Sequence, residues 1–356
     1  MSAAARPRLG TSITELGDFE LECGEVLPNT RIAHRSWGRL APTGTNAVVV
    51  CHALTGSPDV DLWWSDLLGP GLSLDPDRDF IVCCNILGSC YGSTGPASLI
   101  PGTGRRWGGD FPPVTVADAV RAQRQILDVL GVRGIRLVVG GSLGGMQVLE
   151  WAVQDSRVAA AAVIAAPTRH SAWCIAQSEA QRAAIAADSR WCAGHFDPGN
   201  PPVDGLAAAR KMAMCSYRTP RSLGGRFGRR RAEDGGFEVQ GWLRHHGHAL
   251  VDRFDAASYV QLTHTMDSHD VGRGRGGVEH ALGSLEIPVL AVAIDSDGLY
   301  PADEQLEIAE LAPLGELVTL RSPHGHDTFL IETADLDLHL RSFRRRASAF
   351  RRRLAS

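Results

Sequence analysis

The stretch "VVGGSLGGMQ" (138–147) places a single serine, Ser142, between two pairs of glycines. It follows the apolar strand pattern "IRLVV" (135–139) and leads into "LGGMQVLEWAVQ" (143–154), whose apolar residues recur at helical spacing. Gly140 to Gly144 fit the pattern G-x-S-x-G in the strand, turn and helix order that a nucleophile elbow requires. At so sharp a turn the serine backbone is strained, and only small neighbours let the strand and the helix approach each other. The glycines therefore predict a sharply exposed Ser142 hydroxyl.

A glycine-rich turn can also carry an incidental serine, or it can bind a phosphate at the start of a helix. A phosphate-binding P-loop would have a lysine after its last glycine, but Met146 occupies that region. A dinucleotide-binding turn would lie nearer the start of the chain, with an acid at the end of the next strand. We therefore interpret Ser142 as a nucleophile, and we expect the N–H of Leu143, at the helix N-terminus, to stabilise an oxyanion.

Short runs rich in valine and isoleucine recur along the chain, and helical patterns lie between them. Runs without polar alternation suit strands that are buried on both faces, as in a parallel sheet covered by helices. Thr115 is a plausible cap for a helix over 116–131, whose apolar stripe is interrupted only by Gln123, and Pro301 suits the first turn of another helix. The alternation predicts an α/β fold with a mostly parallel sheet and helices on both faces. The six expected strands begin near Asn46, Asp79, Ile135, Val158, Ile287 and Gly315.

Residues 168–285 interrupt this rhythm, because they contain no clear buried-strand run and are rich in alanine, glutamine, tryptophan and arginine. We expect a helical insertion that lies over the carboxyl edge of the sheet, where ligands bind in such folds, and that acts as a lid. The chain would then consist of a first core part (1–167), the lid (168–285) and a second core part (286–356). Within the lid, "GGRFGRRRAEDGG" (224–236) is expected to form an exposed loop.

The composition is that of an ordinary globular protein: 44% of the 356 residues are hydrophobic and 21% are charged. A chain of this length and composition can bury one large core. The net charge of −4 gives no overall reason to expect a nucleic-acid partner. Two basic runs, 226–231 and 344–353, are interpreted as a solvated loop and a solvated helix C-terminus rather than as RNA contacts.

Cysteine spacing and hydropathy argue against a metal centre, a membrane span and a signal peptide. The eight cysteines show no CxxC pair and no zinc-site spacing, so we expect no metal centre. No stretch approaches the roughly 18 apolar residues that span a membrane, and "MSAAARPRLG" (1–10) lacks the apolar core of a signal peptide. We therefore expect a cytoplasmic protein without a membrane partner.

A nucleophilic serine needs a base and an acid that orients the base, and in folds of this kind both follow it at the ends of late strands. One late run ends in "AIDSDG", which offers Asp295 and Asp297. The last run is followed by "SPHGHD", which offers His324 and His326. Both segments fall where the topology needs them, and the residues alone leave the choice within each pair open.

The run that begins near Asn46 is followed by "HALTG" (52–56). Folds with a nucleophile elbow take a second oxyanion donor from the backbone of such a loop. We assign this role to the N–H of Leu54 and interpret His52 as a residue that shapes the loop. A second group of histidines comprises His245, His246 and His248. These residues would bind a metal only if carboxylates joined them, so we interpret them as surface or packing residues.

Together these residues resemble the homoserine O-acetyltransferases, a family with the α/β-hydrolase fold. The resemblance runs from about Phe19 to Glu332 and implies this fold with an inserted helical lid. It rests on six motifs in the order that the family has: "HALTG" (52–56), "GSCYGSTGP" (88–96), "GGSLGGMQVLEW" (140–151), "SHDVGRGRGG" (268–277), "SDGLYP" (296–301) and "GHDTFL" (325–330).

The resemblance implies a role for each site residue. It implies that Ser142 is the nucleophile, that His326 is the base and that Asp297 orients the base, since "SD-x-LYP" is the matching motif. It also implies that Arg210 and Asp327 bind the acceptor. A guanidinium can hold the carboxylate of an amino acid bidentately, and a carboxylate can hold its ammonium group.

The activity that the resemblance implies is transfer of an acyl group from acyl-CoA to L-homoserine by a ping-pong route through an acyl-serine. Acetyl-CoA would be the co-substrate, with no permanently bound cofactor. The enzyme would serve amino-acid biosynthesis, in particular that of methionine, as a homodimer joined through its lid helices. Transfer rather than hydrolysis requires a site with little water, so we expect Ser142 in a narrow tunnel.

Other substrates and functions remain open. The chain departs from its relatives at "SPDVDLWW" (57–64) and at Ser89, both beside the expected acyl pocket, so succinyl-CoA is an alternative donor. Serine is an alternative acceptor, because discrimination of one methylene is worth only about 1–3 kcal/mol. A serine esterase is a more distant alternative. A binding protein without catalysis is another, which the complete set of serine, aspartate and histidine disfavours.

Overall fold

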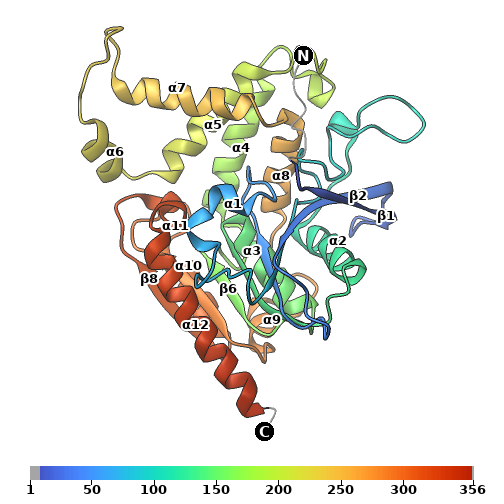
Figure 1. Cartoon of the computed structure of the whole chain (residues 1–356). Helices are drawn as coiled ribbons and strands as arrows, with labels where there is room; N and C mark the ends of the chain where they lie inside the picture. The colour runs from blue at the N-terminus through green and yellow to red at the C-terminus, as the bar shows by residue number, and fades with distance from the viewer. Residues whose placement is uncertain (1–8, 355–356) are drawn as a thin grey trace.

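The computed structural model describes residues 9–354, which form one sheet of eight strands in the order β1-β2-β4-β3-β5-β6-β7-β8 (Figure 1). The strands from β3 to β8 are parallel, and β1 and β2 are added antiparallel at one edge. The parallel strands are the six predicted runs, which confirms the predicted fold class. The strands are β1 (Ser12–Glu20), β2 (Val26–Trp37), β3 (Ala47–Cys51), β4 (Phe80–Cys84), β5 (Ile135–Gly141), β6 (Ala161–Ile164), β7 (Val289–Ile294) and β8 (Gly315–Leu320).

The sequence patterns missed β1 and β2, because neither strand is buried on both faces. Most residues of β1 are at least partly exposed, and β2 mixes buried with exposed positions. The parallel strands in the middle of the sheet are different, since every residue of β3, β4, β6 and β7 is buried. Continuous apolar runs are thus typical of the strands in the sheet's interior, and the run that begins near Gly315 also predicted β8, an edge strand that is partly exposed.

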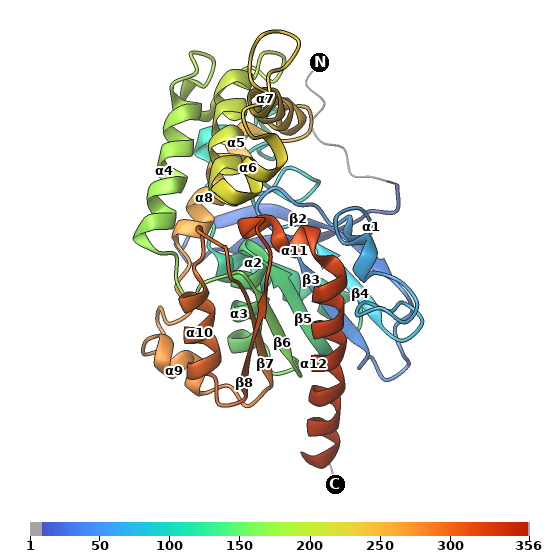
Figure 2. The same cartoon turned by 90° about the vertical axis from the view of Figure 1, so that its left-hand side faces the viewer.

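Helices cover both faces of the sheet, with α12 along one face and α3 and α10 along the other (Figure 2). Alternate residues of β3 point to opposite faces. Val49 packs in a cluster with Val120 of α2, whereas Val50 packs in a second cluster with Leu336 and Phe343 of α12. The core helices are α1 (Val60–Trp63), α2 (Val116–Val129), α3 (Leu143–Gln154), α10 (Ala302–Leu311), α11 (Thr328–Ile331) and α12 (Thr333–Leu354).

Both residues expected at helix starts, Thr115 and Pro301, are N-caps in the structure. Thr115 is the N-cap of α2 and forms a capping box: its hydroxyl accepts from the N–H of Asp118 at 3.0 Å, and the Asp118 carboxylate accepts from the N–H of Thr115 at 3.0 Å. Pro301 lies one residue earlier than expected, at the N-cap of α10 rather than in its first turn.

Between β6 and β7 the chain leaves the sheet and forms α4 to α9. Helices α4 to α8 lie beyond the carboxyl ends of the strands, at the top of Figure 1. The chain then returns through α9, where Val278 and Leu282 pack in the same cluster as α2 and α3. The helices of this insertion are α4 (Ala172–Ala186), α5 (Val203–Tyr217), α6 (Pro220–Phe227), α7 (Glu238–Val251), α8 (Ala256–Asp267) and α9 (Val278–Gly283).

The expectation of a loop over 224–236 is wrong for its first four residues, which belong to α6. This helix has a local start signal, since the Thr219 hydroxyl accepts from the N–H of Ser222 at 2.9 Å and Pro220 occupies the first turn. The helix continues to Phe227, whose side chain is buried. The exposed loop begins only after it, at 228.

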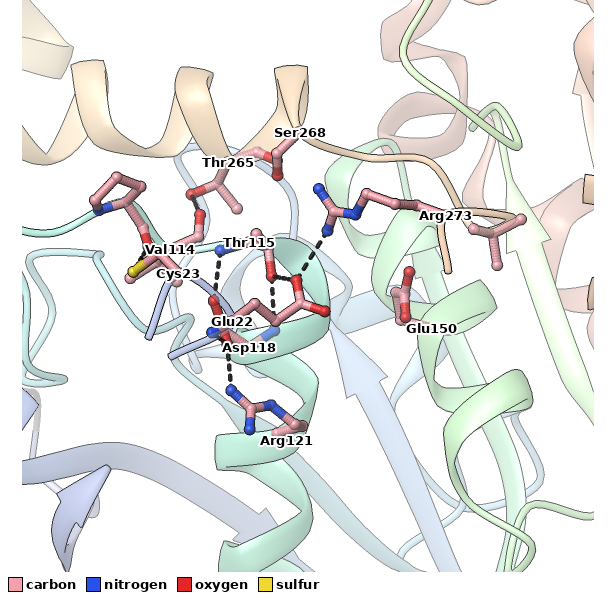
Figure 3. Close-up of polar contacts among 12 residues, drawn as sticks. Glu22, Cys23, Val114, Thr115, Asp118, Arg121, Glu150, Thr265, Ser268 and Arg273 are labelled. Atoms are coloured by element: carbon pink, nitrogen blue, oxygen red, sulfur yellow. Dashed lines mark hydrogen bonds and ion pairs between the residues drawn. The ribbon is translucent and has the colours of Figure 1, made fainter. Parts of the chain in front are cut away.

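Figure 3 shows how the end of the insertion is tied to the core. Arg273 donates to the carboxylate of Glu22 at 2.8 Å, and the hydroxyl of Thr115 donates to the same carboxylate oxygen. The hydroxyl of Thr265, near the end of α8, donates to the carbonyl of Val114 at 2.7 Å. These contacts join the insertion to the β1–β2 turn and to the first turn of α2, so the insertion has a defined place over the sheet.

The helices and the metal-ligating side chains of residues 9–354 bear on membranes and metals. In that range no helix is both long and apolar enough to cross a bilayer. In the same range no group of three or more His, Cys, Asp or Glu side chains is arranged to hold a metal ion.

Candidate active site

Ser142 lies at the turn between β5 and α3, at the carboxyl edge of the sheet. Its backbone has φ 58° and ψ −127°, a conformation that is strained for a residue with a Cβ. Its N–H donates to the carbonyl of Ile164, at the end of β6, with an N–O distance of 2.9 Å, which holds the turn in place. Ser142 is 8% exposed, so it does not lie open to bulk solvent.

The glycines around Ser142 are needed because other backbone lies against them. A Cβ at Gly144 would lie 2.2 Å from the carbonyl oxygen of Cys51, and one at Gly140 would lie 2.7 Å from the same oxygen. A Cβ at Gly145 would lie 2.5 Å from that of Ala166. Only glycine therefore lets the first turn of α3 lie this close to the ends of β3 and β6.

His326 and Asp297 form a buried pair at the ends of β8 and β7. His326 Nδ1 lies 2.7 Å from Asp297 Oδ2, and the side chains are 4% and 0% exposed. The other carboxylate oxygen of Asp297 accepts from the N–H groups of Leu299 and Tyr300 at 2.8 and 3.0 Å. Burial lowers the pKa of His326, but the charge and hydrogen bond of Asp297 outweigh it, so the pKa is raised above 6.5 overall. The pair occupies Nδ1 of His326 and leaves its Nε2 available for a proton.

The other two residues that the sequence offered for this pair lie in different contacts. Asp295 accepts from the N–H of Ser322 at 3.1 Å. His324 Nδ1 lies 3.0 Å from the hydroxyl of Ser222, in α6. The structure thus brings together Asp297 and His326, the pair that the family resemblance had implied.

Leu54 and Leu143 are the residues proposed to donate backbone N–H groups to an oxyanion. Both side chains are buried in one apolar cluster that also contains Tyr300. Among residues 9–354 neither N–H has a hydrogen-bond partner, although both residues are buried. Buried N–H groups are nearly always paired, so these two unpaired ones, one of which directly follows Ser142 in the chain, are suited to a ligand oxygen.

A chain of buried amides holds the loop that carries Leu54. Gln147 donates to the carbonyl oxygens of His52 and Leu143, at 3.1 Å in both cases. Gln123 donates to Gln147 at 2.8 Å and accepts from the indole N–H of Trp151 at 3.0 Å. This explains why a glutamine interrupts the apolar stripe of α2: Gln123 is buried and positions the group that holds the loop.

His52 belongs to the same loop and is fully buried. Its Nδ1 lies 2.9 Å from the carbonyl oxygen of Ala53, and its Nε2 accepts from the N–H of Ile86 at 3.2 Å. Burial lowers the pKa of His52 to about 4, so the ring is neutral at physiological pH. With both nitrogens occupied, His52 shapes the loop rather than transferring protons.

The insertion brings charged and aromatic groups to His326. Arg210, on α5, has its guanidinium carbon 5.6 Å from the ring centre of Tyr217, which lies 5.6 Å from that of His326. Asp327 directly follows the base, and its Oδ2 lies 2.9 Å from Nε of Arg218. The two side chains are 16% and 13% exposed. Burial raises the pKa of Asp327, and the positive charges of Arg218, His326 and Arg210 partly offset this rise.

Sequence reasoning missed Tyr217 and Arg218. A usable signal was present, because these residues stand seven and eight positions after Arg210. That spacing places all three on one face of a helix. Helix α5 ends at Tyr217. Arg218, the next residue, has an extended backbone, and its side chain contacts Asp327.

Comparison with known proteins shows the family. The model of the alpha/beta hydrolase fold matches residues 46–333. The chain is 52% identical over 337 residues to the homoserine O-acetyltransferase of Chloroherpeton thalassium, across 93% of this chain and 89% of that one. The chain belongs to the homoserine O-acetyltransferase family. The resemblance found in the sequence motifs is thereby confirmed.

Solved structures show how widely the fold of this family is shared. The homoserine O-acetyltransferase of Bacillus anthracis has a TM-score of 0.87 at 21% identity, over 94% of this chain and 97% of that one. Esterase E22 also has a TM-score of 0.87, at 24% identity over 94% of this chain and 99% of that one. At these identities the likeness is one of fold, and the fold alone does not separate transferase from esterase.

In this homoserine O-acetyltransferase family member, a further group of buried side chains lies against His326. The ring centre of Tyr300 lies 5.1 Å from that of His326. The Tyr300 hydroxyl lies 3.1 Å from Nε2 of His170, whose Nδ1 lies 3.0 Å from Asp267. The contact links the base to α8 of the insertion, so the position of the insertion and the position of the base depend on each other.

Proposed function

We propose that this protein is a homoserine O-acetyltransferase, which moves the acetyl group of acetyl-CoA to the side-chain hydroxyl of L-homoserine. The observation that carries the proposal is the charged pair beside the base, in which Asp327 meets Arg218 of the insertion at 2.9 Å. An amino-acid acceptor has an ammonium and a carboxylate that such groups bind, whereas ester hydrolysis by water needs neither. The relative from Chloroherpeton thalassium is named a homoserine O-acetyltransferase, which supports the same activity.

In the first half of the reaction, Nε2 of His326 takes the proton of the Ser142 hydroxyl. The Ser142 oxygen attacks the thioester carbonyl carbon, and the N–H groups of Leu54 and Leu143 hold the developing oxyanion. The C–S bond then breaks, and the CoA sulfur leaves with the proton from His326. Asp297 keeps the ring oriented and stabilises its charged form throughout.

In the second half, L-homoserine binds with its ammonium at Asp327 and its carboxylate at Arg210. The Oδ1 atom of Asp327, which the ion pair with Arg218 does not use, receives the ammonium group. His326 takes the proton of the homoserine hydroxyl, whose oxygen attacks the acetyl-serine carbonyl. The ester bond to Ser142 breaks, and its oxygen recovers the proton from His326. No metal or permanently bound cofactor is needed in either half.

Transfer of the acetyl group to homoserine, instead of hydrolysis, requires that little water reaches the acetyl-serine. The low exposure of Ser142, at 8%, supports this requirement, and α4 to α8 act as the lid that provides it. In this division residues 168–285 form the lid, and the described residues of the two core parts, 9–167 and 286–354, form the core.

Three alternatives differ in substrate. Succinyl-CoA as donor or L-serine as acceptor would use the same groups, with a different pocket size. A serine esterase is the third, in which water would take the place of the amino-acid acceptor.

One assay separates these functions. Thiol release is followed with acetyl-CoA or succinyl-CoA, each with L-homoserine, L-serine or no acceptor, and Ser142→Ala serves as control. Release that needs both acetyl-CoA and L-homoserine supports the proposal. Release at the same rate without acceptor, still dependent on Ser142, would identify a hydrolase and remove the acceptor roles of Arg210 and Asp327.

We also propose a homodimer that forms through the lid helices. The supporting observation is that α4 exposes two large apolar side chains, Trp173 at 53% and Ile175 at 38%. Light scattering of the purified chain measures the mass directly. A Trp173→Ser variant is expected to become monomeric, and a wild-type chain that is already monomeric would contradict the proposal.

A further inference from the structure

A cavity of about 790 Å³ lies at the end of the sheet opposite the site described above. Its walls include residues next to the amino ends of strands: Arg78 precedes β4, Arg136 is near the start of β5, and Ala160 precedes β6. The other wall is the second half of α12, which extends past this edge of the sheet at the bottom of Figure 2. Ser142 and His326 lie at the carboxyl ends of strands, so the two sites are on opposite edges.

Guanidinium groups dominate the lining of this cavity. Within residues 9–354, seven arginines line it, and only two carboxylates pair with any of them: Asp79 and Asp337. The lining therefore carries an excess of five positive charges, although the net charge of the chain is −4. The seven are Arg78, Arg136, Arg341, Arg344, Arg345, Arg351 and Arg352.

Two of these guanidinium groups are fixed in the cavity wall. Asp79, which is 1% exposed, accepts from Arg136 at 3.1 Å and from Arg344 at 2.7 Å. Arg344 also donates to the backbone carbonyl of Ser73. A guanidinium has five N–H donors, so both groups keep donors for a further acceptor while their positions are already set.

The remaining positive charge is not neutralised by the protein. Arg78, Arg345, Arg351 and Arg352 are exposed and form no ion pair within residues 9–354. Repulsion among like charges held around one hollow is unfavourable, and a bound anion relieves it. A solvated helix end would turn such side chains outward over a convex surface, whereas here they line a hollow together with the sheet edge.

We propose that this cavity binds a small molecule that carries several linked phosphates, such as a nucleoside triphosphate. Planar guanidinium groups match phosphate oxygens bidentately, and the excess of positive charge suits a chain of phosphates better than a single one. The volume is in the range of pockets that hold small ligands. The site is separate from acetyl transfer, and it joins α12 to the sheet edge through the ligand.

Sodium tripolyphosphate is the probe that tests the phosphate chemistry by itself. Titration calorimetry with the full-length protein is expected to show binding at one site at low salt. The binding is expected to be lost at about 1 M salt, where the screening length falls to about 3 Å. ATP and AMP form the second arm: ATP binds at least as tightly as tripolyphosphate, and AMP binds at least tenfold more weakly than ATP.

Adjacent residues of α12 provide matched variants. Arg345 and Arg346 are both exposed, but Arg345 lines the cavity and Arg346 pairs with Glu316 elsewhere. Arg345→Ala is expected to raise the Kd for tripolyphosphate about tenfold, the effect of losing one charge-assisted contact, and Arg346→Ala to change it less than about twofold. Arg352→Ala, further along α12, is expected to raise the Kd for tripolyphosphate by a similar factor.

The proposal fails if tripolyphosphate does not bind, or if Arg345→Ala and Arg346→Ala weaken binding equally, which would mean nonspecific attraction. It also fails if only a long single-stranded RNA binds, since the patch would then be a nucleic-acid surface. A melting temperature that rises with tripolyphosphate in the wild type and not in Arg345→Ala supports it independently. Thiol release stays at the wild-type rate in these variants, so the result does not depend on the proposed function.

Discussion

Replacing Arg218 with glutamine removes the positive charge beside Asp327 and leaves most of the side-chain volume. The lost contact is an ion pair in which Arg218 Nε lies 2.9 Å from Asp327 Oδ2, between side chains that are 13% and 16% exposed. Without Arg218, Asp327 loses the partner that holds it in place and keeps it charged. If Asp327 holds the acceptor through a charged hydrogen bond worth about 1.5–3 kcal/mol, loss of that bond should raise the KM for L-homoserine about ten- to a hundredfold. The first half of the reaction does not use Asp327, and the burst of CoA release should keep its wild-type rate.

The pH dependence makes this prediction sharper. Burial already raises the pKa of Asp327, and the charge of Arg218 is one of the groups that lower it. In Arg218→Gln that pKa rises further, so more of the carboxyl group is protonated and unable to hold an ammonium at low pH. The increase in KM should therefore be largest at low pH and shrink as pH rises. The assay is steady-state thiol release at several pH values with L-homoserine varied.

The result that would refute this reasoning is a KM for L-homoserine equal to that of the wild type. A burst that slows as much as the full reaction would also refute it, because Arg218 would then support the base and not the acceptor. Arg210→Ala is the companion variant, for which the same tenfold to hundredfold rise in KM is expected.

Three further predictions concern the nucleophile, the acid and the glycine turn. Ser142→Ala should abolish thiol release while its unfolding curve in urea stays that of the wild type; residual transfer would exclude an acyl-serine. Asp297→Asn should lower the rate by about three to four orders of magnitude. It should also move the acidic limb of the pH profile to lower pH, because the paired imidazole must be neutral to act as a base and its raised pKa depends on this charge. Gly144→Ala should lower the free energy of unfolding by about 1–3 kcal/mol, since its Cβ would lie 2.2 Å from the Cys51 oxygen. Gly224→Ala, with no atom within 4 Å of the new Cβ, should be neutral or stabilising in the same measurement.

Local patterns in the sequence were enough for the interior of the fold. Continuous apolar runs predicted β3 to β7, because strands covered on both faces need no polar residue. The run that begins near Gly315 predicted β8 as well, although β8 is a partly exposed edge strand. The same reasoning missed β1 and β2, which lie at the edge of the sheet and are partly exposed. It also placed the start of the exposed loop too early, since the capping by Thr219 and the contact of Phe227 carry α6 further.

The sequence by itself determined the elbow around Ser142, the chain order of serine, acid and histidine, and the family. These follow from short-range steric constraints and from motifs, and both can be recognised in the amino-acid sequence without the fold. The family motif implied Asp297 rather than Asp295, and the tertiary structure shows its contact with His326. Only the tertiary structure decided that Arg218 meets Asp327 and that arginines of α12 face arginines of the sheet edge. Each of these contacts joins segments that are separate in the chain. Their distances depend on how the sheet, the insertion and α12 pack, and no local pattern of residues encodes that packing.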